Sequence, residues 1–179
     1  MNLVCELYLD LATALQRAGD PETANRELVE CVDLATLGEG FTATDGPETF
    51  WRILRAQAQL IDSAGDSYRA LRLAEAALFH AQRVRSRLGA ARVQQLLAAL
   101  CEKAGLGGKA ERYRSAAINE MRNLGDRRAT AELLLTETPS RGAVVLHSRL
   151  QDALQISKEI GWAEGHERAK RKSNPPSVG

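Results

Sequence analysis

The sequence has few aromatic residues, few cysteines and no long hydrophobic run. Aromatic residues make up 4% of the 179 residues, so large rings cannot dominate the core. No apolar run approaches the roughly 20 residues that cross a bilayer. The first ten residues contain Glu6 and no basic residue, which is unlike a secretory signal peptide. We therefore expect neither a membrane span nor a signal peptide.

Cysteine is scarce as well, and its placement indicates the redox compartment. The three cysteines are Cys5, Cys31 and Cys101. An odd, scattered set is unlike the disulfide framework of a small secreted protein and fits a reducing compartment. We therefore expect a cytoplasmic protein with reduced thiols.

Patterns that would carry catalytic or metal chemistry are missing too. The histidines His80, His147 and His166 are isolated, and none has the spacing of a metal site. The segment GLGGKA (105–110) superficially resembles a phosphate-binding loop but lacks the Ser or Thr after Lys109. The sequence therefore predicts no enzyme activity, no metal and no cofactor.

The residues that are abundant favour helices and divide the chain by charge. Ala, Leu, Arg, Glu and Gln dominate, and these residues suit helices that pack through small side chains. Residues 1–50 carry ten acids and two bases, a net charge of −8. Residues 51–179 carry thirteen acids and twenty-two bases, a net charge of +9. Either solvated helix faces differ in sign, or the two ends meet oppositely charged partners.

One pattern recurs three times along the chain, starting at Leu11, Gln57 and Leu97. In each copy a helix with a small residue runs into an Ala-Gly pair, and a second helix follows with two more small residues. The small residues are Ala12, Ala24 and Cys31, then Ala58, Ala70 and Ala77, then Ala98, Ala110 and Ala117; the glycines are Gly19, Gly65 and Gly105.

The spacing of this pattern has a physical explanation. Glycine ends a helix in the left-handed conformation at no steric cost. Two helices joined by so short a turn lie antiparallel and close, and close approach requires small side chains where they cross. A single hairpin cannot bury its apolar stripe, so neighbouring hairpins must stack.

The repeats at 5–35, 51–84 and 91–121 resemble the tetratricopeptide repeat (TPR). The distances from Gly19 to Gly65 and from Gly65 to Gly105 are 46 and 40 residues. This length is similar to that of the long repeats in bacterial signalling and transcription-regulatory proteins. The resemblance implies an all-α fold, a right-handed α-solenoid of about four antiparallel hairpins near residues 3–36, 48–86, 89–124 and 127–160.

The C-terminal segment contains both a helix-like stretch and a basic, polar end. Residues 160–173 have the look of another junction and the start of another first helix. We nevertheless assign the repeat domain to residues 1–165. We expect residues 166–179, which are basic and end in SNPPSVG, to form a disordered C-terminal tail.

The resemblance also indicates where a partner would bind. In TPR arrays the first helices of successive hairpins line a concave groove. Arg52 and Arg55 are three residues apart, so they project from one face of a helix, and stacking would bring Arg92 beside them. The candidate groove residues are Arg52, Arg55, Gln59, Arg92, Gln95 and Arg128. The alternative is that these are ordinary solvated side chains.

The favoured function is a scaffold or adaptor that binds a protein or peptide partner through this groove. Guanidinium and amide donors suit a partner segment with acidic or carboxylate groups. One alternative is a sensor or regulatory domain of a larger bacterial signalling protein. A less favoured alternative is a solenoid that binds nucleic acid through the basic half of the chain.

Overall fold

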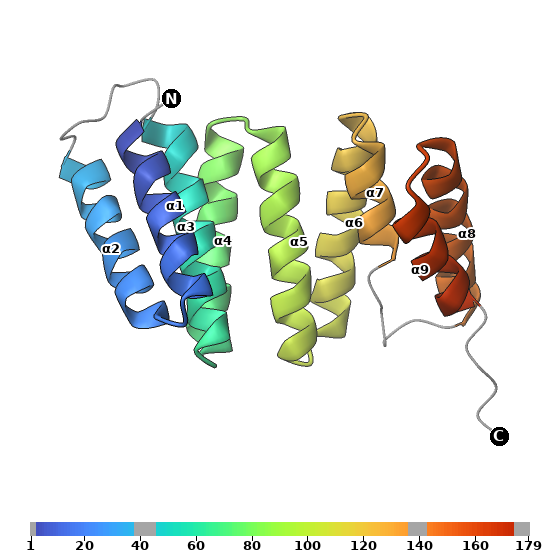
Figure 1. The fold of residues 1–179 in the computed structure, drawn as a ribbon, viewed down its shortest axis with the longest axis horizontal. Helices are drawn as coiled ribbons and strands as arrows, with labels where there is room; N and C mark the ends of the chain where they lie inside the picture. The colour runs from blue at the N-terminus through green and yellow to red at the C-terminus, as the bar shows by residue number, and fades with distance from the viewer. Residues whose placement is uncertain (1–2, 38–45, 136–142, 174–179) are drawn as a thin grey trace.

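The structure is a computed structural model that describes residues 3–37, 46–135 and 143–173. These residues form helices whose successive hairpins follow one another along the long axis (Figure 1). Among the described helices, none is long and apolar enough to cross a membrane. The helices are α1 (Leu3–Arg17), α2 (Pro21–Leu37), α3 (Gly46–Ser63), α4 (Ser67–Arg83), α5 (Arg87–Lys103), α6 (Gly107–Asn123), α7 (Arg127–Leu134), α8 (Ala143–Glu159) and α9 (Ala163–Ser173).

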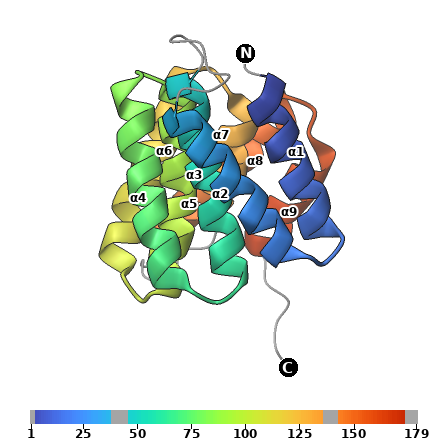
Figure 2. The same ribbon diagram turned by 90° about the vertical axis from the view of Figure 1, so that its left-hand side faces the viewer.

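The helices pack as antiparallel pairs that stack on one another. α1 packs on α2, α3 on α4, α5 on α6 and α7 on α8, and each second helix then packs on the next first helix. The first helices also meet directly, since α1 contacts α3 and α3 contacts α5. Figure 2 looks onto the α1–α2 end of this stack. The predicted all-helical solenoid of hairpins is confirmed.

The hairpin turns follow the predicted glycine geometry. Gly65 has φ 93°, and the N–H of Asp66 beyond it donates to the carbonyl oxygen of Ile61 at 3.1 Å. The turn between α4 and α5 has the same bond, from the N–H of Ser86 to the carbonyl of Ala81 at 2.9 Å, but places Arg85 at φ 57°. A residue with a side chain is strained at such a φ, and the other described turns have glycine there. Because this turn has Arg85 instead, the glycine pattern of the sequence does not predict it.

A polar residue after most of these turns caps the next helix. Asp66 accepts the N–H of Arg69 at 3.0 Å, and Asp20 accepts that of Thr23 at the same distance. Ser86 and Asp126 do the same for α5 and α7. α6 differs, because Leu106 stands at its cap position and makes no side-chain hydrogen bond. That helix therefore begins without a side-chain acceptor for its first backbone donors.

Small side chains fill the helix crossings, as predicted. Ala24, Ala70 and Ala110, the first small residues of the second helices, are fully buried. On α4 a stripe of alanines shares one core cluster with larger side chains of α3 and α5. The stripe is Ala70, Ala74, Ala77 and Ala81, and the larger side chains are Trp51, Leu54 and Ile61 of α3 and Val93, Leu97 and Leu100 of α5.

The expectation of a disordered tail from residue 166 is wrong for its first part. α9 extends to Ser173, and its Gly165 and Ala169 are buried. A Cβ atom on Gly165 would meet the ring of Trp162 at 2.0 Å, so the ring lies in the space that a side chain at this position would fill. Lys172 also donates to the carbonyl oxygen of Leu135 at 3.0 Å. Residues 174–179 lie outside the described residues.

Candidate functional site

Three arginines come together where α3 and α5 lie side by side. Arg52 and Arg55 project from α3, and Arg92 projects from α5. Arg55 is half-buried, and its Nε is shielded from solvent with no hydrogen-bond partner among the described residues. Arg92 is exposed. We call these three residues the arginine cluster.

The positive charges of the arginine cluster repel one another. The pKa of Arg55 is lowered first by burial, and then by the positive charges of Arg92 and Arg52. Burial disfavours a charged group, and like charges nearby disfavour it further. An arginine does not give up its proton in a protein, so the cost remains as unfavourable charge. An anion placed between Arg55 and Arg92 would relieve it.

Within the cluster, Arg52 is already neutralised. Both its terminal nitrogens bond the carboxylate of Glu6 on α1, and the Nη2–Oε2 distance is 3.0 Å. The pair is partly exposed and joins the first helices of two hairpins. Arg52 therefore positions α1 beside α3 and supplies less free charge than Arg55 and Arg92.

The two predicted glutamines are accessible on the same helices. Gln59 lies one turn beyond Arg55 on α3, Gln95 lies one turn beyond Arg92 on α5, and both are exposed. At the far end of the two helices, Lys103 pairs with Asp62, which also accepts a hydrogen bond from Ser67 at 3.2 Å. On this surface the amides of Gln59 and Gln95 thus lie between the positively charged arginine cluster and the Lys103–Asp62 ion pair, whose charges cancel.

Arg128 has a different environment from the other five predicted residues. It lies on α7, with its guanidinium carbon 5.2 Å from the centre of the Trp162 ring and its Nε 3.4 Å from Glu132. No described contact joins it to the arginine cluster. Its stacking on Trp162 ties α7 to the turn between α8 and α9.

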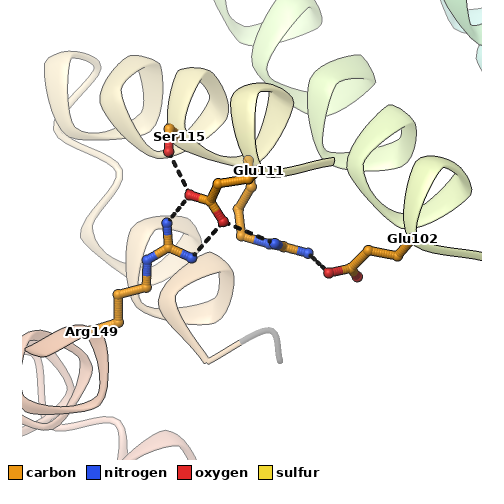
Figure 3. A network of polar contacts seen from close by, with 5 residues as sticks. Glu102, Glu111, Ser115 and Arg149 are labelled. Carbon is orange, nitrogen blue, oxygen red and sulfur yellow. Dashed lines mark hydrogen bonds and ion pairs between the residues drawn. The ribbon is translucent and has the colours of Figure 1, made fainter. Parts of the chain in front are cut away.

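Sequence reasoning missed a second group of charges, which is buried between α5, α6 and α8 (Figure 3). Glu111 accepts hydrogen bonds from Ser115 at 2.8 Å and from Arg149 of α8. Arg114, whose side chain is 1% exposed, pairs with Glu111 at 3.3 Å and with Glu102 of α5. We call Glu102, Glu111, Arg114, Ser115 and Arg149 the buried network.

A comparison of equivalent positions in the three repeats could have indicated this network. Arg114 is nine residues after Gly105, and the residues nine after Gly19 and Gly65 are Leu28 and Ala74. Both of those are fully buried. A charged residue at a core position requires partners, and Arg114 finds them in two carboxylates. Beside the network lies a cavity of about 350 Å³ that is lined by Ser115, Asn119, Arg122, Ser148, Arg149 and Asp152, among others.

The described cysteine side chains belong to the core. Cys31 and Cys101 are buried, and burial raises the pKa of the Cys101 thiol. Cys5 lies outside the described side chains. Among the residues that the structure describes, no His, Cys, Asp and Glu side chains gather as a metal site would require.

The comparisons with known proteins concern the fold. No protein-family model matches this chain, and no curated protein matches it. The chain is similar to BtubC (BKLC) from P. vanneervenii, with 16% identity, a TM-score of 0.65, and coverage of 94% of this chain and 77% of that one.

Two further structures hold TPR-like repeats of a kinesin-light-chain-like protein from Podosopora anserina. One is 13% identical with a TM-score of 0.53 and covers 98% of this chain and all of that one. The other, a substituted form of the same protein, is 13% identical with a TM-score of 0.54 and covers 97% and 95%. At these identities the likeness shows the fold, and the fold is that of TPR-like solenoids.

Proposed function

We propose that this protein is an interaction scaffold whose first helices bind an acidic, extended segment of a partner protein. The observation that carries the proposal is the arginine cluster, in which Arg55 is half-buried beside Arg92 and its Nε has no partner among the described residues. A carboxylate between the two guanidinium groups would form charge-assisted hydrogen bonds with both. Exposed Gln59 and Gln95 would bind the backbone of the same segment.

A binding role fits these groups better than catalysis. Guanidinium groups stay protonated and cannot exchange protons with a substrate near neutral pH. They bind carboxylates with defined geometry, which gives specificity. Arg128, stacked on Trp162, would lie outside the main contact and could meet only a longer segment.

Two further aspects of the proposal concern the setting of the scaffold. The odd, scattered set of three cysteines, of which Cys31 and Cys101 are buried in the core, supports a reducing compartment such as the cytoplasm. The long repeat spacing supports a place in a bacterial signalling or transcription-regulatory assembly, in which the partner segment belongs to another component.

The experiment is a peptide selection followed by direct binding measurements. Random displayed peptides of about a dozen residues, a length that spans the groove of a few hairpins, are selected on the wild-type chain. Arg55→Glu with Arg92→Glu should weaken binding of the selected peptides by about tenfold or more, since each charge-assisted bond contributes roughly 1.5–3 kcal/mol. Arg83→Glu with Arg112→Glu changes two exposed arginines on second helices and is the matched control.

The expected outcome is enrichment of Asp- and Glu-rich peptides that the control variant binds normally. Enrichment of apolar or basic peptides, or equal binding by the two double variants, would contradict the proposal. Binding of generic duplex DNA that weakens steeply with salt and is lost with the cluster would indicate the nucleic-acid alternative instead.

A further inference from the structure

The outer face of α1 exposes apolar side chains at helical spacing. Leu7 is 59% exposed and Leu11, one turn on, is 44% exposed. Ala14 is exposed on the same face one turn later. Counted back from the turn at Gly19, these residues stand twelve, eight and five positions before the glycine. We call Leu7, Leu11 and Ala14 the α1 stacking face.

The same three positions are buried in the next two hairpins. Before Gly65 they hold Ile53, Gln57 and Leu60, and before Gly105 they hold Val93, Leu97 and Leu100; all six are buried. Ile53 and Leu60 belong to the cluster of Ala24, Leu28 and Cys31 from α2. The α5 residues share one core cluster with the alanine stripe of α4, and α4 contacts α5 directly. This face of a first helix therefore receives the second helix of the preceding hairpin.

No described element covers the α1 stacking face, and the hairpin that carries it has a net negative charge. Described residues 3–37 contain seven acids and two bases, a net charge of −5; the acids are Glu6, Asp10, Asp20, Glu22, Glu27, Glu30 and Asp33, and the bases are Arg17 and Arg26. Exposed Asp10 stands three residues after Leu7, at the edge of the face. A helix that docks here would be favoured by basic flanks.

We propose that the α1 stacking face binds an α-helix of a different protein, one that presents small apolar residues at helical spacing and basic residues beside them. The bound helix takes the place that α2 takes on α3 and α4 takes on α5, so it continues the stack. The chain then has two docking surfaces of opposite charge, an acidic end for a basic helix and the arginine cluster for an acidic segment.

A second copy of this chain fits the face poorly. Two α1 stacking faces would bring two net negative hairpins together, and like charges oppose that contact. The far end of the stack is α9, whose exposed side chains are charged apart from Ala163. Such a surface has no apolar stripe to cover Leu7 and Leu11.

The probe is a capped peptide with the sequence of residues 66–85, which contains α4 and its cap. It carries the alanine stripe, with four arginines against Asp66 and Glu75, a net charge of +2. The full ¹⁵N-labelled chain is titrated with this peptide, and saturable shift changes should centre on α1. Leu7→Gln with Leu11→Gln should weaken binding by about tenfold, a free-energy change of about 1.4 kcal/mol.

Control variants distinguish docking on α1 from nonspecific hydrophobic binding, and a helix-content measurement distinguishes it from unfolding. Leu88→Gln with Leu124→Gln replaces two leucines that are each 40% exposed elsewhere and should bind as the wild type does. A peptide with Gln at the positions of Ala74 and Ala77 should not bind. Circular dichroism should show equal helix content in all three chains.

Three results would overturn the inference. The first is the absence of saturable binding. The second is binding that the α1 variant retains at wild-type strength. The third is a dimer in sedimentation that Leu7→Gln with Leu11→Gln dissociates, because a second copy would then occupy the face.

Discussion

Burial lowers the pKa of Arg55 on α3, and Arg92 on α5 lies close enough for its positive charge to lower that pKa further. The two residues are 37 positions apart in sequence, and stacking of successive hairpins brings them together. An unrelieved pair of like charges on neighbouring helices costs stability. We therefore expect Arg55→Gln to leave the chain as stable as, or slightly more stable than, the wild type in urea. A loss of more than about 1 kcal/mol would mean that Arg55 has a structural role that these contacts do not include.

The alanine crossings predict a test of the repeat register. Ala70→Leu inserts a branched side chain at a fully buried alanine in the core cluster of α3, α4 and α5, and overpacking should cost about 1–3 kcal/mol. Ala99→Leu, at an exposed position on α5, is the matched control and should change stability little. Urea denaturation of both variants measures the difference. Equal midpoints would show that Ala70 is not at a crossing.

The uncapped start of α6 predicts a stabilising change. Leu106→Asp restores the residue type that caps α4 and α7, and should add about 0.5–2 kcal/mol to the free energy of unfolding at neutral pH. The hydrogen bond from Thr23 lowers the pKa of the equivalent Asp20. The gain should therefore be full above the carboxyl pKa of the unfolded chain and should be lost as the pH falls. Thermal melts at neutral and acidic pH test this, and a gain that grows in acid would exclude capping.

The buried network predicts a large loss for one substitution. Arg114→Met removes a guanidinium that is 1% exposed and leaves Glu102 and Glu111 without it, which should cost about 3–5 kcal/mol. Arg112→Met changes an exposed neighbour on the same helix and should be nearly neutral. Denaturation curves compare the two. Similar small losses for both would show that Arg114 contributes no more than a surface residue.

The core thiols predict a difference in reactivity. Thiol labelling requires the thiolate, and burial both shields Cys101 and raises its pKa. In a Cys5→Ser chain, Cys31 and Cys101 should react slowly in native buffer and quickly in denaturant. Mass spectrometry after short labelling times measures both rates. Fast native labelling would place the two thiols at the surface.

The repetitive part of the fold was predictable from sequence because few residue types satisfy its constraints. A close helix crossing requires Ala or Cys, as at Ala24 and Cys31, and a left-handed turn favours Gly, as at Gly65. These residues recur in register, so both the hairpins and the pairing of α3 with α5 could be anticipated.

The remaining features depend on contacts that no local pattern encodes. The turn at Arg85 lacks its glycine, and the hydrogen bond from Lys172 of α9 to the carbonyl of Leu135 joins residues 37 positions apart. The ion pair of Arg52 with Glu6 joins residues 46 positions apart. Composition alone could not separate this neutralised arginine from Arg55, whose Nε has no such partner in the described part of the chain.

The central claim is that Arg55 and Arg92 bind carboxylates of a partner segment. A charge exchange tests it most directly, by titration calorimetry of a selected acidic peptide against the wild type and Arg55→Glu with Arg92→Glu. The same two proteins are then titrated with a peptide in which Lys replaces the contacting acids. The account predicts about tenfold weaker binding in each mismatched pair and recovery when both charges are exchanged. Equal affinities in all four combinations, with both proteins folded, would contradict it.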